Sequence, residues 1–212
     1  MTRDTLDVDV LIVGGGPAGL SAALRLAQLQ KAHAGEPLAI AVLEKAREAG
    51  AHMLSGAVLD PSALGDLVPD FIERGAPLEA EVHEDRVYFL TGPQSRIPLP
   101  ITPPPLRNHG NYVISLNRFD KWLAGLVEAE GIDLFVGFPG VEVLLDGDRV
   151  VGVRTGDKGI GKNGEQRPAF EPGVNIHAKV TIFADGVRGN LTAQLLRRLP
   201  LARGRQPQQF AI

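Results

Sequence analysis

The chain opens on a short apolar run followed by a glycine-rich turn, Val8-Asp-Val-Leu-Ile-Val-Gly14-Gly-Gly-Pro-Ala-Gly19. Residues 8–13 predict a buried strand of a parallel sheet, because a short β-branched run ends there in glycine. Residues 18–30 predict an amphipathic helix, since their apolar side chains recur at helical spacing. A second apolar run at residues 40–43 completes a βαβ unit, which indicates an α/β fold with a right-handed crossover.

The glycine spacing G-x-G-x-x-G is typical of dinucleotide-binding turns. Gly14 allows the tight turn, Gly16 lets the backbone approach a pyrophosphate, and Gly19 lets the helix pack closely on the strand. The N-terminus of the helix then offers N–H groups and a partial positive charge to the phosphates. Glu44, at the end of the second strand, is placed to accept hydrogen bonds from a ribose. We therefore predict a dinucleotide site rather than a glycine turn without function.

Asp185 and Gly186 lie between a predicted buried strand, residues 180–184, and a predicted final helix, residues 190–199. Two interpretations are open: a second backbone turn that approaches the cofactor, or an aspartate that caps the helix. Ligands collect outside the carboxyl ends of parallel strands, so we favour the cofactor.

The remaining pattern predicts a series of shorter elements. They are a turn or helix after Asp60-Pro61, strands at 86–90, 96–101 and 112–116, a helix at 118–130 capped by Asn117, a hairpin at 141–154 and a polar loop at 155–173. The loop repeats G-x-G-x-x-G from Gly159 to Gly164, and residues 156–162 mimic a P-loop. We interpret both as coincidence, because no helix follows and Asn163 replaces the Ser or Thr that would bind magnesium.

Composition excludes several classes of protein. The chain has 212 residues, 44% hydrophobic and 22% charged, which is typical of a globular domain. Its 22 basic and 25 acidic residues give a net charge of −3 and no general reason to bind nucleic acid. There are no cysteines and the five histidines lie apart, so no disulfide, thiolate nucleophile or metal site is predicted.

Charge and hydropathy at the two ends lead to further expectations. No signal peptide, transit peptide or membrane-spanning helix is predicted, because acidic residues precede an apolar run that glycines interrupt. After Asp185 the chain has five arginines, Arg188, Arg197, Arg198, Arg203 and Arg205, and no acidic residue. This basic stretch is either a solvated helix face with a frayed end or a surface for an acidic partner or anionic lipid.

Further blocks of sequence accompany the first motif. They are Ile12-Val-Gly-Gly-Gly-Pro-Ala-Gly-Leu-Ser-Ala-Ala, Leu43-Glu-Lys, Gly50-Ala-His-Met-Leu-Ser-Gly-Ala, Glu84-Asp-Arg, Arg96-Ile-Pro, Asn108-His-Gly-Asn-Tyr and His177-Ala-Lys-Val-Thr-Ile-Phe-Ala. Many flavoproteins share the first block. Together the blocks resemble the N-terminal part of the electron-transfer flavoprotein:ubiquinone oxidoreductases, although Met53 and Asp185 stand where that family more often has Thr and Glu.

The resemblance implies a Rossmann-like, FAD-binding α/β fold of the glutathione-reductase type, with an inserted β-rich, proline-rich segment. It implies an FAD-binding βαβ region at residues 1–85, a membrane- and quinone-side hairpin at 86–116, and the remainder of the FAD-binding region at 117–212. The implied enzyme takes electrons from reduced electron-transfer flavoprotein and passes them to ubiquinone at a membrane surface. The family's later part, which holds a four-iron four-sulfur cluster and its four cysteines, has no counterpart in this sequence.

The resemblance also implies which residues contact FAD. They are Gly14, Gly15, Gly16, Pro17, Ala18, Gly19, Glu44, Lys45, Ser55, Gly56, Asp185 and Gly186. Arg118 is either a further cofactor contact or an exposed residue of a helix's first turn. No catalytic residue is expected, because electron transfer through a flavin needs no acid, base or nucleophile from the protein.

Residues 87–106 contain six prolines and one charged residue, Arg96. This proline density excludes a spanning helix. From the residues alone the segment reads as a proline-rich packing loop, whereas the resemblance implies a monotopic hairpin that dips into the membrane. The expected location is then the cytoplasmic face of a bacterial inner membrane, or the mitochondrial inner membrane for an organellar protein.

Two alternatives stay open at this stage. A flavin monooxygenase or geranylgeranyl-reductase-like enzyme would share the first motif and a glycine near Asp185, but no second nucleotide site is evident. The other alternative is an inactive, truncated fragment that folds partly and binds FAD weakly or not at all.

Overall fold

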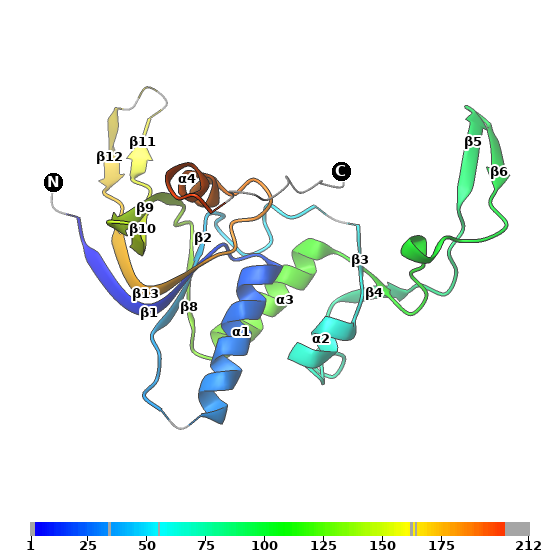
Figure 1. The fold of residues 1–212 in the computed structure, drawn as a ribbon, viewed down its shortest axis with the longest axis horizontal. Helices are drawn as coiled ribbons and strands as arrows, with labels where there is room; N and C mark the ends of the chain where they lie inside the picture. The colour runs from blue at the N-terminus through cyan, green and yellow to red at the C-terminus, as the bar shows by residue number, and fades with distance from the viewer. Residues whose placement is uncertain (1–2, 34, 55, 162, 164, 202–212) are drawn as a thin grey trace. The chain divides into compact units, whose positions relative to one another are not determined.

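A computed structural model describes residues 3–33, 35–54, 56–161, 163 and 165–201 of the chain. Figure 1 shows the helices and strands with the labels used below. The chain divides into two compact units, one formed by Met1–Ala49 with Ala124–Ile212 and the other by Gly50–Leu123. Each unit is described by itself.

The first unit contains the glycine-rich turn and most of the strands. Its elements are β1 (Thr5–Val13), α1 (Pro17–Ala32), β2 (Ile40–Glu44), β8 (Asp133–Val136), β9 (Gly140–Asp146), β10 (Arg149–Thr155), β11 (Lys158–Ile160), β12 (Gln166–Glu171), β13 (Asn175–Phe183) and α4 (Asn190–Arg198). A further helix, α3 (Leu116–Ala129), runs across the boundary between the units.

A six-stranded sheet in the order β8-β2-β1-β13-β10-β9 organises this unit. The strands β8, β2, β1 and β13 are parallel, with Val13 paired to Leu43 of β2 and to Phe183 of β13. Two antiparallel strands complete the sheet. β10 pairs with the first residues of β13, and β9 pairs with β10. Because β1, α1 and β2 form a βαβ unit in a parallel sheet, the predicted Rossmann-like arrangement is confirmed.

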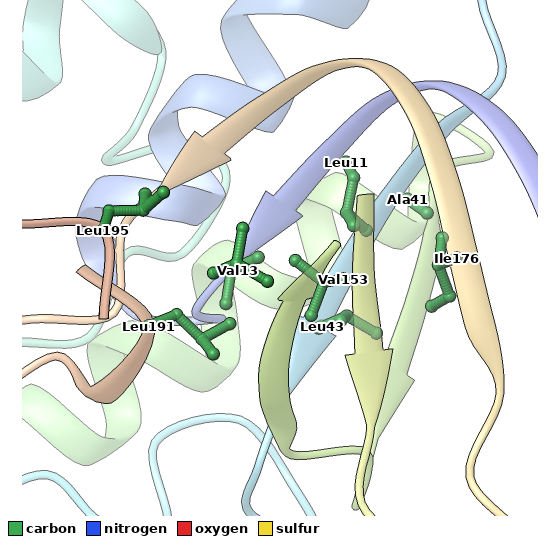
Figure 2. Packing of buried hydrophobic residues seen from close by; sticks show 9 residues of the cluster. Leu11, Val13, Ala41, Leu43, Val153, Ile176, Leu191 and Leu195 are labelled. Atoms are coloured by element: carbon green, nitrogen blue, oxygen red, sulfur yellow. The ribbon is translucent and has the colours of Figure 1, made fainter. Parts of the chain in front are cut away.

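Both faces of the parallel strands are covered by apolar side chains. On one face Leu11, Val13, Ala41 and Leu43 pack with Val143, Val153 and Ile176 and with Leu191 and Leu195 of α4 (Figure 2). α1 packs against β1 and β2 and buries Leu20, Ala23, Leu24 and Ala27. This double cover explains why residues 10–13 and 40–43 form continuous apolar runs.

Two predictions for this unit need correction, and one strand was missed. Residues 155–173 are not a polar loop, because β11 and β12 pair there as an antiparallel hairpin. The strand predicted at 180–184 begins already at Asn175, since the polar start of β13 pairs with the equally polar start of β1 at Thr5. The strand β8 was not predicted. The hairpin at 141–154 and the helix at 190–199 are confirmed as β9–β10 and α4.

The second unit is built on a three-stranded sheet and a separate hairpin. Its elements are β3 (Ala57–Leu59), α2 (Ser62–Leu67), β4 (Leu78–Glu81), β5 (Tyr88–Gly92), β6 (Ser95–Pro98), the 3-10 helix η1 (Pro104–Leu106) and β7 (Tyr112–Ile114). The sheet order is β3-β7-β4, and β5 pairs only with β6 among the described strands. The expected short elements after Asp60 and around residues 88–98 are therefore present.

The prediction that Asn117 caps a helix starting at Arg118 is wrong. The helix α3 begins at Leu116, so Asn117 lies inside its first turn. The Asn117 side chain instead donates a hydrogen bond of 2.6 Å to the Gly50 carbonyl. Gly50 has φ +76, and a Cβ built on it would lie 2.6 Å from the Asn117 carbonyl oxygen, so Gly50 fits closely against the start of α3.

An ion pair between Arg3 and Asp157 joins the segment before β1 to the connection between β10 and β11. Arg3 pairs with Asp157 and also donates 3.1 Å to the Gly173 carbonyl, while the Gly173 N–H donates 2.7 Å to Asp157. The hydrogen bond from Arg3, with that from Gly173, lowers the pKa of Asp157 to about 2. A lowered carboxyl pKa contributes stability that is complete above the ordinary pKa of 3.8 and is lost as the pH falls towards 2.

We expect Arg3→Ala to raise the pKa of Asp157 towards 3.8, because its first cause is removed. The carboxyl carbon of Asp157, followed by NMR between pH 5 and pH 1, measures this directly. Arg25→Ala is the matched control, since Arg25 is an exposed residue of α1 that donates a hydrogen bond to Gln28. An unchanged Asp157 pKa in Arg3→Ala would contradict the pairing.

No helix in the described residues has both the length and the apolar composition to cross a membrane.

Candidate functional site

The tight turn after β1 requires glycine at position 14. Gly14 has φ +111, and its N–H donates 2.8 Å to the Leu43 carbonyl at the end of β2. A Cβ built on Gly14 would overlap the Ala184 carbonyl oxygen and lie 2.8 Å from the Ala184 carbonyl carbon. The first glycine therefore lets two parts of the chain, 170 residues apart (184 minus 14), touch backbone to backbone.

The carboxylate of Glu44 is held against the same turn. Its two oxygens accept the N–H of Gly15 at 2.9 Å and the N–H of Ala46 at 2.7 Å. A Cβ built on Gly15 would lie 2.9 Å from the Glu44 Cβ, so any side chain at position 15 would displace the carboxylate. Lys45, the next residue, is exposed. The sequence order thus places a fixed negative group at the carboxyl end of β2, beside the glycine turn.

The start of α1 has the features of an anion-binding helix N-terminus. No side chain caps it, Gly16 at the cap position has φ −90 and ψ −179, and Pro17 occupies the first turn. A Cβ built on Gly19 would overlap the Gly14 carbonyl oxygen and lie 3.2 Å from the Ile12 side chain. Gly19 is therefore required for close packing of α1, as predicted. Uncapped N–H groups at such an end attract phosphate.

A second turn comes next to the first through the pairing of β13 with β1. The Ala184 N–H donates 2.8 Å to the Val13 carbonyl, and Gly186 has φ +79. The Asp185 carboxylate accepts the N–H groups of Leu191 at 3.0 Å and Thr192 at 3.1 Å, and also the Thr192 hydroxyl. The aspartate side chain therefore caps α4, while its backbone lies beside Gly14. The interpretation of Asp185 as a cap of the following helix is thus confirmed, whereas the approach of this turn to a cofactor stays a prediction.

Gly189 was not identified from the sequence. A Cβ built on it would overlap the Asp185 carboxylate, so a larger residue would displace the cap of α4. The spacing Asp185-Gly-Val-Arg-Gly189 is the signal that identifies it, because a carboxylate folding back over a helix start needs room at the residue it crosses.

Most of the other candidate residues belong to the second unit or lie outside the described residues. Gly56 is exposed with φ +85. Arg118 is exposed in the first turn of α3 and forms an ion pair of 2.6 Å with Glu79. Ser55, Arg203 and Arg205 lie outside the described residues, as do Lys162 and Gly164 of the repeated glycine motif. Gly159, also from that motif, lies in β11 with φ +70.

Comparison with known proteins agrees with this geometry. A family model for an NAD(P)-binding Rossmann-like domain matches residues 12–76. The chain is 46% identical over 214 aligned positions to human mitochondrial electron transfer flavoprotein-ubiquinone oxidoreductase, covering 100% of this chain and 34% of the human protein. It is 44% identical to the probable counterpart from Acinetobacter baylyi, covering 99% of this chain and 37% of that protein.

These matches fall on the N-terminal part of the relatives, and the chain spans about a third of their length. The resemblance drawn from the sequence blocks is therefore confirmed for that part. Among solved structures, a geranylgeranyl bacteriochlorophyll reductase-like protein from Thermoplasma acidophilum is 28% identical with a TM-score of 0.60, over 86% of this chain and 40% of that chain. A flavin-dependent monooxygenase solved with FAD and substrate, 23% identical with a TM-score of 0.58 over 90% of this chain and 32% of its own, shares the fold.

Proposed function

We propose that this chain is the FAD-binding, N-terminal part of an electron transfer flavoprotein-ubiquinone oxidoreductase. Such an enzyme takes electrons from reduced electron-transfer flavoprotein and passes them to ubiquinone. The observation that carries the proposal is 46% identity along the whole chain to the human protein of that name. The 28% identity to a geranylgeranyl-reductase-like protein is much lower, so that alternative is not favoured.

The first unit fits FAD at the glycine turn. Gly14, Gly15 and Gly19 allow the turn, the Glu44 side chain and α1 to approach one another closely, and the uncapped start of α1 offers N–H groups to a pyrophosphate. We assign the phosphates to residues 14–19, a ribose to Glu44, and the ribityl side of the cofactor to the turn at Asp185 and Gly186. The resemblance adds Lys45, Ser55, Gly56 and Arg118 to these contacts as proposals.

Bound FAD would supply a carrier that accepts and gives up electrons, which is chemistry the side chains lack. The residues of this chain bind and orient the cofactor. Glu44, fixed by two backbone N–H groups, presents a carboxylate of set direction, and the cap formed by Asp185 keeps the second turn in place. The iron–sulfur cluster implied by the resemblance needs cysteines, and this sequence has none.

We propose further that residues 87–106, called the apolar arm below, contact the membrane that holds the ubiquinone. The hairpin β5–β6 forms most of the arm and extends away from the three-stranded sheet of its own unit (Figure 1). The arm exposes Phe89, Leu90, Ile97, Leu99, Ile101 and Leu106. Exposed apolar surface that exceeds the scattered single residues normal on a soluble protein is typical of a docking surface.

We expect Glu44→Gln to weaken FAD binding by about 10-fold to 100-fold, and to lower thermal stability without FAD. The amide keeps one acceptor oxygen but turns an NH₂ group towards a backbone donor, and a hydrogen bond to a charged group is worth about 1.5 to 3 kcal/mol. Titration of apoprotein with FAD, followed by flavin fluorescence, measures the affinity. Glu36→Gln, on an exposed glutamate, is the control and should change neither value. Equal affinities of Glu44→Gln and the parent would argue against the assigned role.

Electron transfer tests the proposed activity. The full-length form should reduce a soluble ubiquinone analogue when supplied with reduced electron-transfer flavoprotein, and should not do so with NADPH alone. Failure with the flavoprotein, or rapid flavin reduction by NADPH, would refute the proposal and favour the monooxygenase or reductase alternative. The inactive-fragment alternative concerns the 212-residue chain itself. It would be supported if that chain folds but retains no FAD.

A further inference from the structure

The two ends of the apolar arm meet at one point of the second unit, where Asp85 contacts Asn108. One carboxylate oxygen of Asp85 accepts the backbone N–H of Asn108 at 2.7 Å, and the other accepts the Asn108 side-chain amide at 3.3 Å. The carbonyl of Asp85 accepts the Thr102 hydroxyl at 3.2 Å. Asp85, just before the arm, therefore holds Thr102 within the arm and Asn108 two residues after it.

On the side away from the arm, the two chain segments continue into the sheet of the same unit. The Val82 N–H donates 2.8 Å to the Asn111 carbonyl, and the Gly110 N–H donates 3.0 Å to the Val82 carbonyl. The Asn111 N–H donates 2.9 Å to the Asn108 carbonyl, which closes a turn with Gly110 at φ +83. These bonds prolong the pairing of β4 with β7, so Asp85 and Asn108 are tied to a strand pair rather than to a free loop.

On the other side, hydrogen bonds connect the segments of the arm to one another. The Leu99 N–H donates 2.8 Å to the Val87 carbonyl and prolongs the β5–β6 ladder towards Asp85. Arg107 donates 3.2 Å from its Nε to the Thr102 carbonyl. Prolines fix the backbone φ at several positions between β6 and Arg107. Rotation of the arm is thus concentrated at the few bonds that flank Asp85 and Asn108.

We propose that Asp85 and Asn108 form a latch that fixes the direction of the apolar arm relative to the sheet β3-β7-β4 before any membrane is met. A carboxylate that bridges a backbone N–H and a side-chain amide holds its partner more rigidly than a single neutral hydrogen bond. The latch assigns a role to two sequence blocks, Glu84-Asp-Arg and Asn108-His-Gly-Asn-Tyr, that the FAD site does not use. What the arm touches rests on the proposed function; that it is latched does not.

A distance measurement between two spin labels tests the latch in the full 212-residue chain, which has no cysteine of its own. Gln94→Cys labels the tip of the arm, and Val113→Cys labels the exposed side of β7. We expect one narrow distance distribution, and a clearly broader one when Asp85→Ala is added. Glu84→Ala is the matched control, because the Glu84 carboxylate pairs with its neighbour Arg86 and not with Asn108 in the described part of the chain, so its loss should leave the distribution narrow.

The milder variant Asp85→Asn guards against misfolding of Asp85→Ala, and its circular dichroism should match the parent. It retains one acceptor oxygen, so intermediate broadening is expected. A broad distribution in the parent, or a narrow one in both Asp85 variants, would overturn the latch.

Vesicles of phosphatidylcholine and phosphatidylglycerol separate the latch from the membrane contact. A latched arm should keep its narrow distribution when the vesicles bind. A shift of the parent distribution on binding would overturn the claim that the direction is set beforehand. If the chain does not bind the vesicles at all, the proposed membrane contact fails, and the label distances in solution still decide the latch.

Discussion

Gly14→Ala is expected to yield a chain that purifies without FAD and binds added FAD at least about 100-fold more weakly than the parent, a loss of about 2.7 kcal/mol. A Cβ at this position overlaps the Ala184 carbonyl oxygen, so β1 and the turn at Asp185 must separate. The φ of +111 also lies where a residue with a side chain is strained by about 1 to 3 kcal/mol. Both turns assigned to FAD therefore move at once.

The measurement is the absorbance of bound flavin per chain, together with a thermal melt of the apoprotein. The matched control is Gly125→Ala, which makes the same substitution on the exposed face of α3, where a Cβ meets open space. That variant should keep its FAD and gain about 0.5 to 1 kcal/mol, because alanine is favoured over glycine in a helix. Full flavin content in Gly14→Ala would contradict the assignment of the glycine turn.

The βαβ unit was predictable because its signals are local. The apolar run of residues 10–13 has no helical spacing, the glycines end it, and Pro17 suits the first turn of a helix. Gly147, with φ +61, likewise marks the β9–β10 turn through its sequence. Such features depend on neighbouring residues only, and the structure agrees with each of them.

The sequence analysis missed the hairpin β11–β12 because neither of its strands has a buried face. Its strands are largely exposed, so no apolar alternation distinguishes them from a loop. The start of β13 was missed for a related reason. Asn175 and His177 are polar, and they form a strand because β1 offers a partner backbone beside them. Hydrogen bonding to a distant strand then outweighs the local pattern.

The sequence predicted the glycine turn and the position of Glu44, but not how a distant part of the chain approaches them. The sequence pattern placed Gly14 at the end of the first strand and Glu44 at the end of the second strand of one βαβ unit, so the two were expected at the same edge of the sheet. The approach of Ala184 to Gly14 follows from the long-range pairing of β13 with β1, which no local pattern reports. The sequence also could not decide whether Asp185 caps α4, because the carboxylate reaches the helix from outside it through the fold of residues 185–191.

Replacing both Phe89 and Ile97 by serine is expected to weaken vesicle binding of the chain by about 100-fold or more. The two residues face each other as a cross-strand pair of β5 and β6, so their side chains share one face of the hairpin. Each is more than half exposed, at 66% and 57%. Full burial of such a side chain is worth about 1.5 to 3 kcal/mol, and the double substitution removes both contributions. Co-sedimentation with vesicles of phosphatidylcholine and phosphatidylglycerol measures the partition.

Ile72→Ser provides the matched control for Ile97→Ser, because Ile72 lies in the same unit outside the arm and is 60% exposed. Exposure alone predicts equal effects, whereas the proposed contact predicts an effect at Ile97 only. The opposite face of the hairpin has Leu90 paired with Arg96, whose guanidinium lies 4.4 Å from the centre of the Tyr88 ring. A charged group is costly to bury in hydrocarbon, so the face of Phe89 and Ile97 is the one expected to enter it. Equal loss of binding in Ile72→Ser and Ile97→Ser would show that apolar exposure in general, and not the arm, governs the contact.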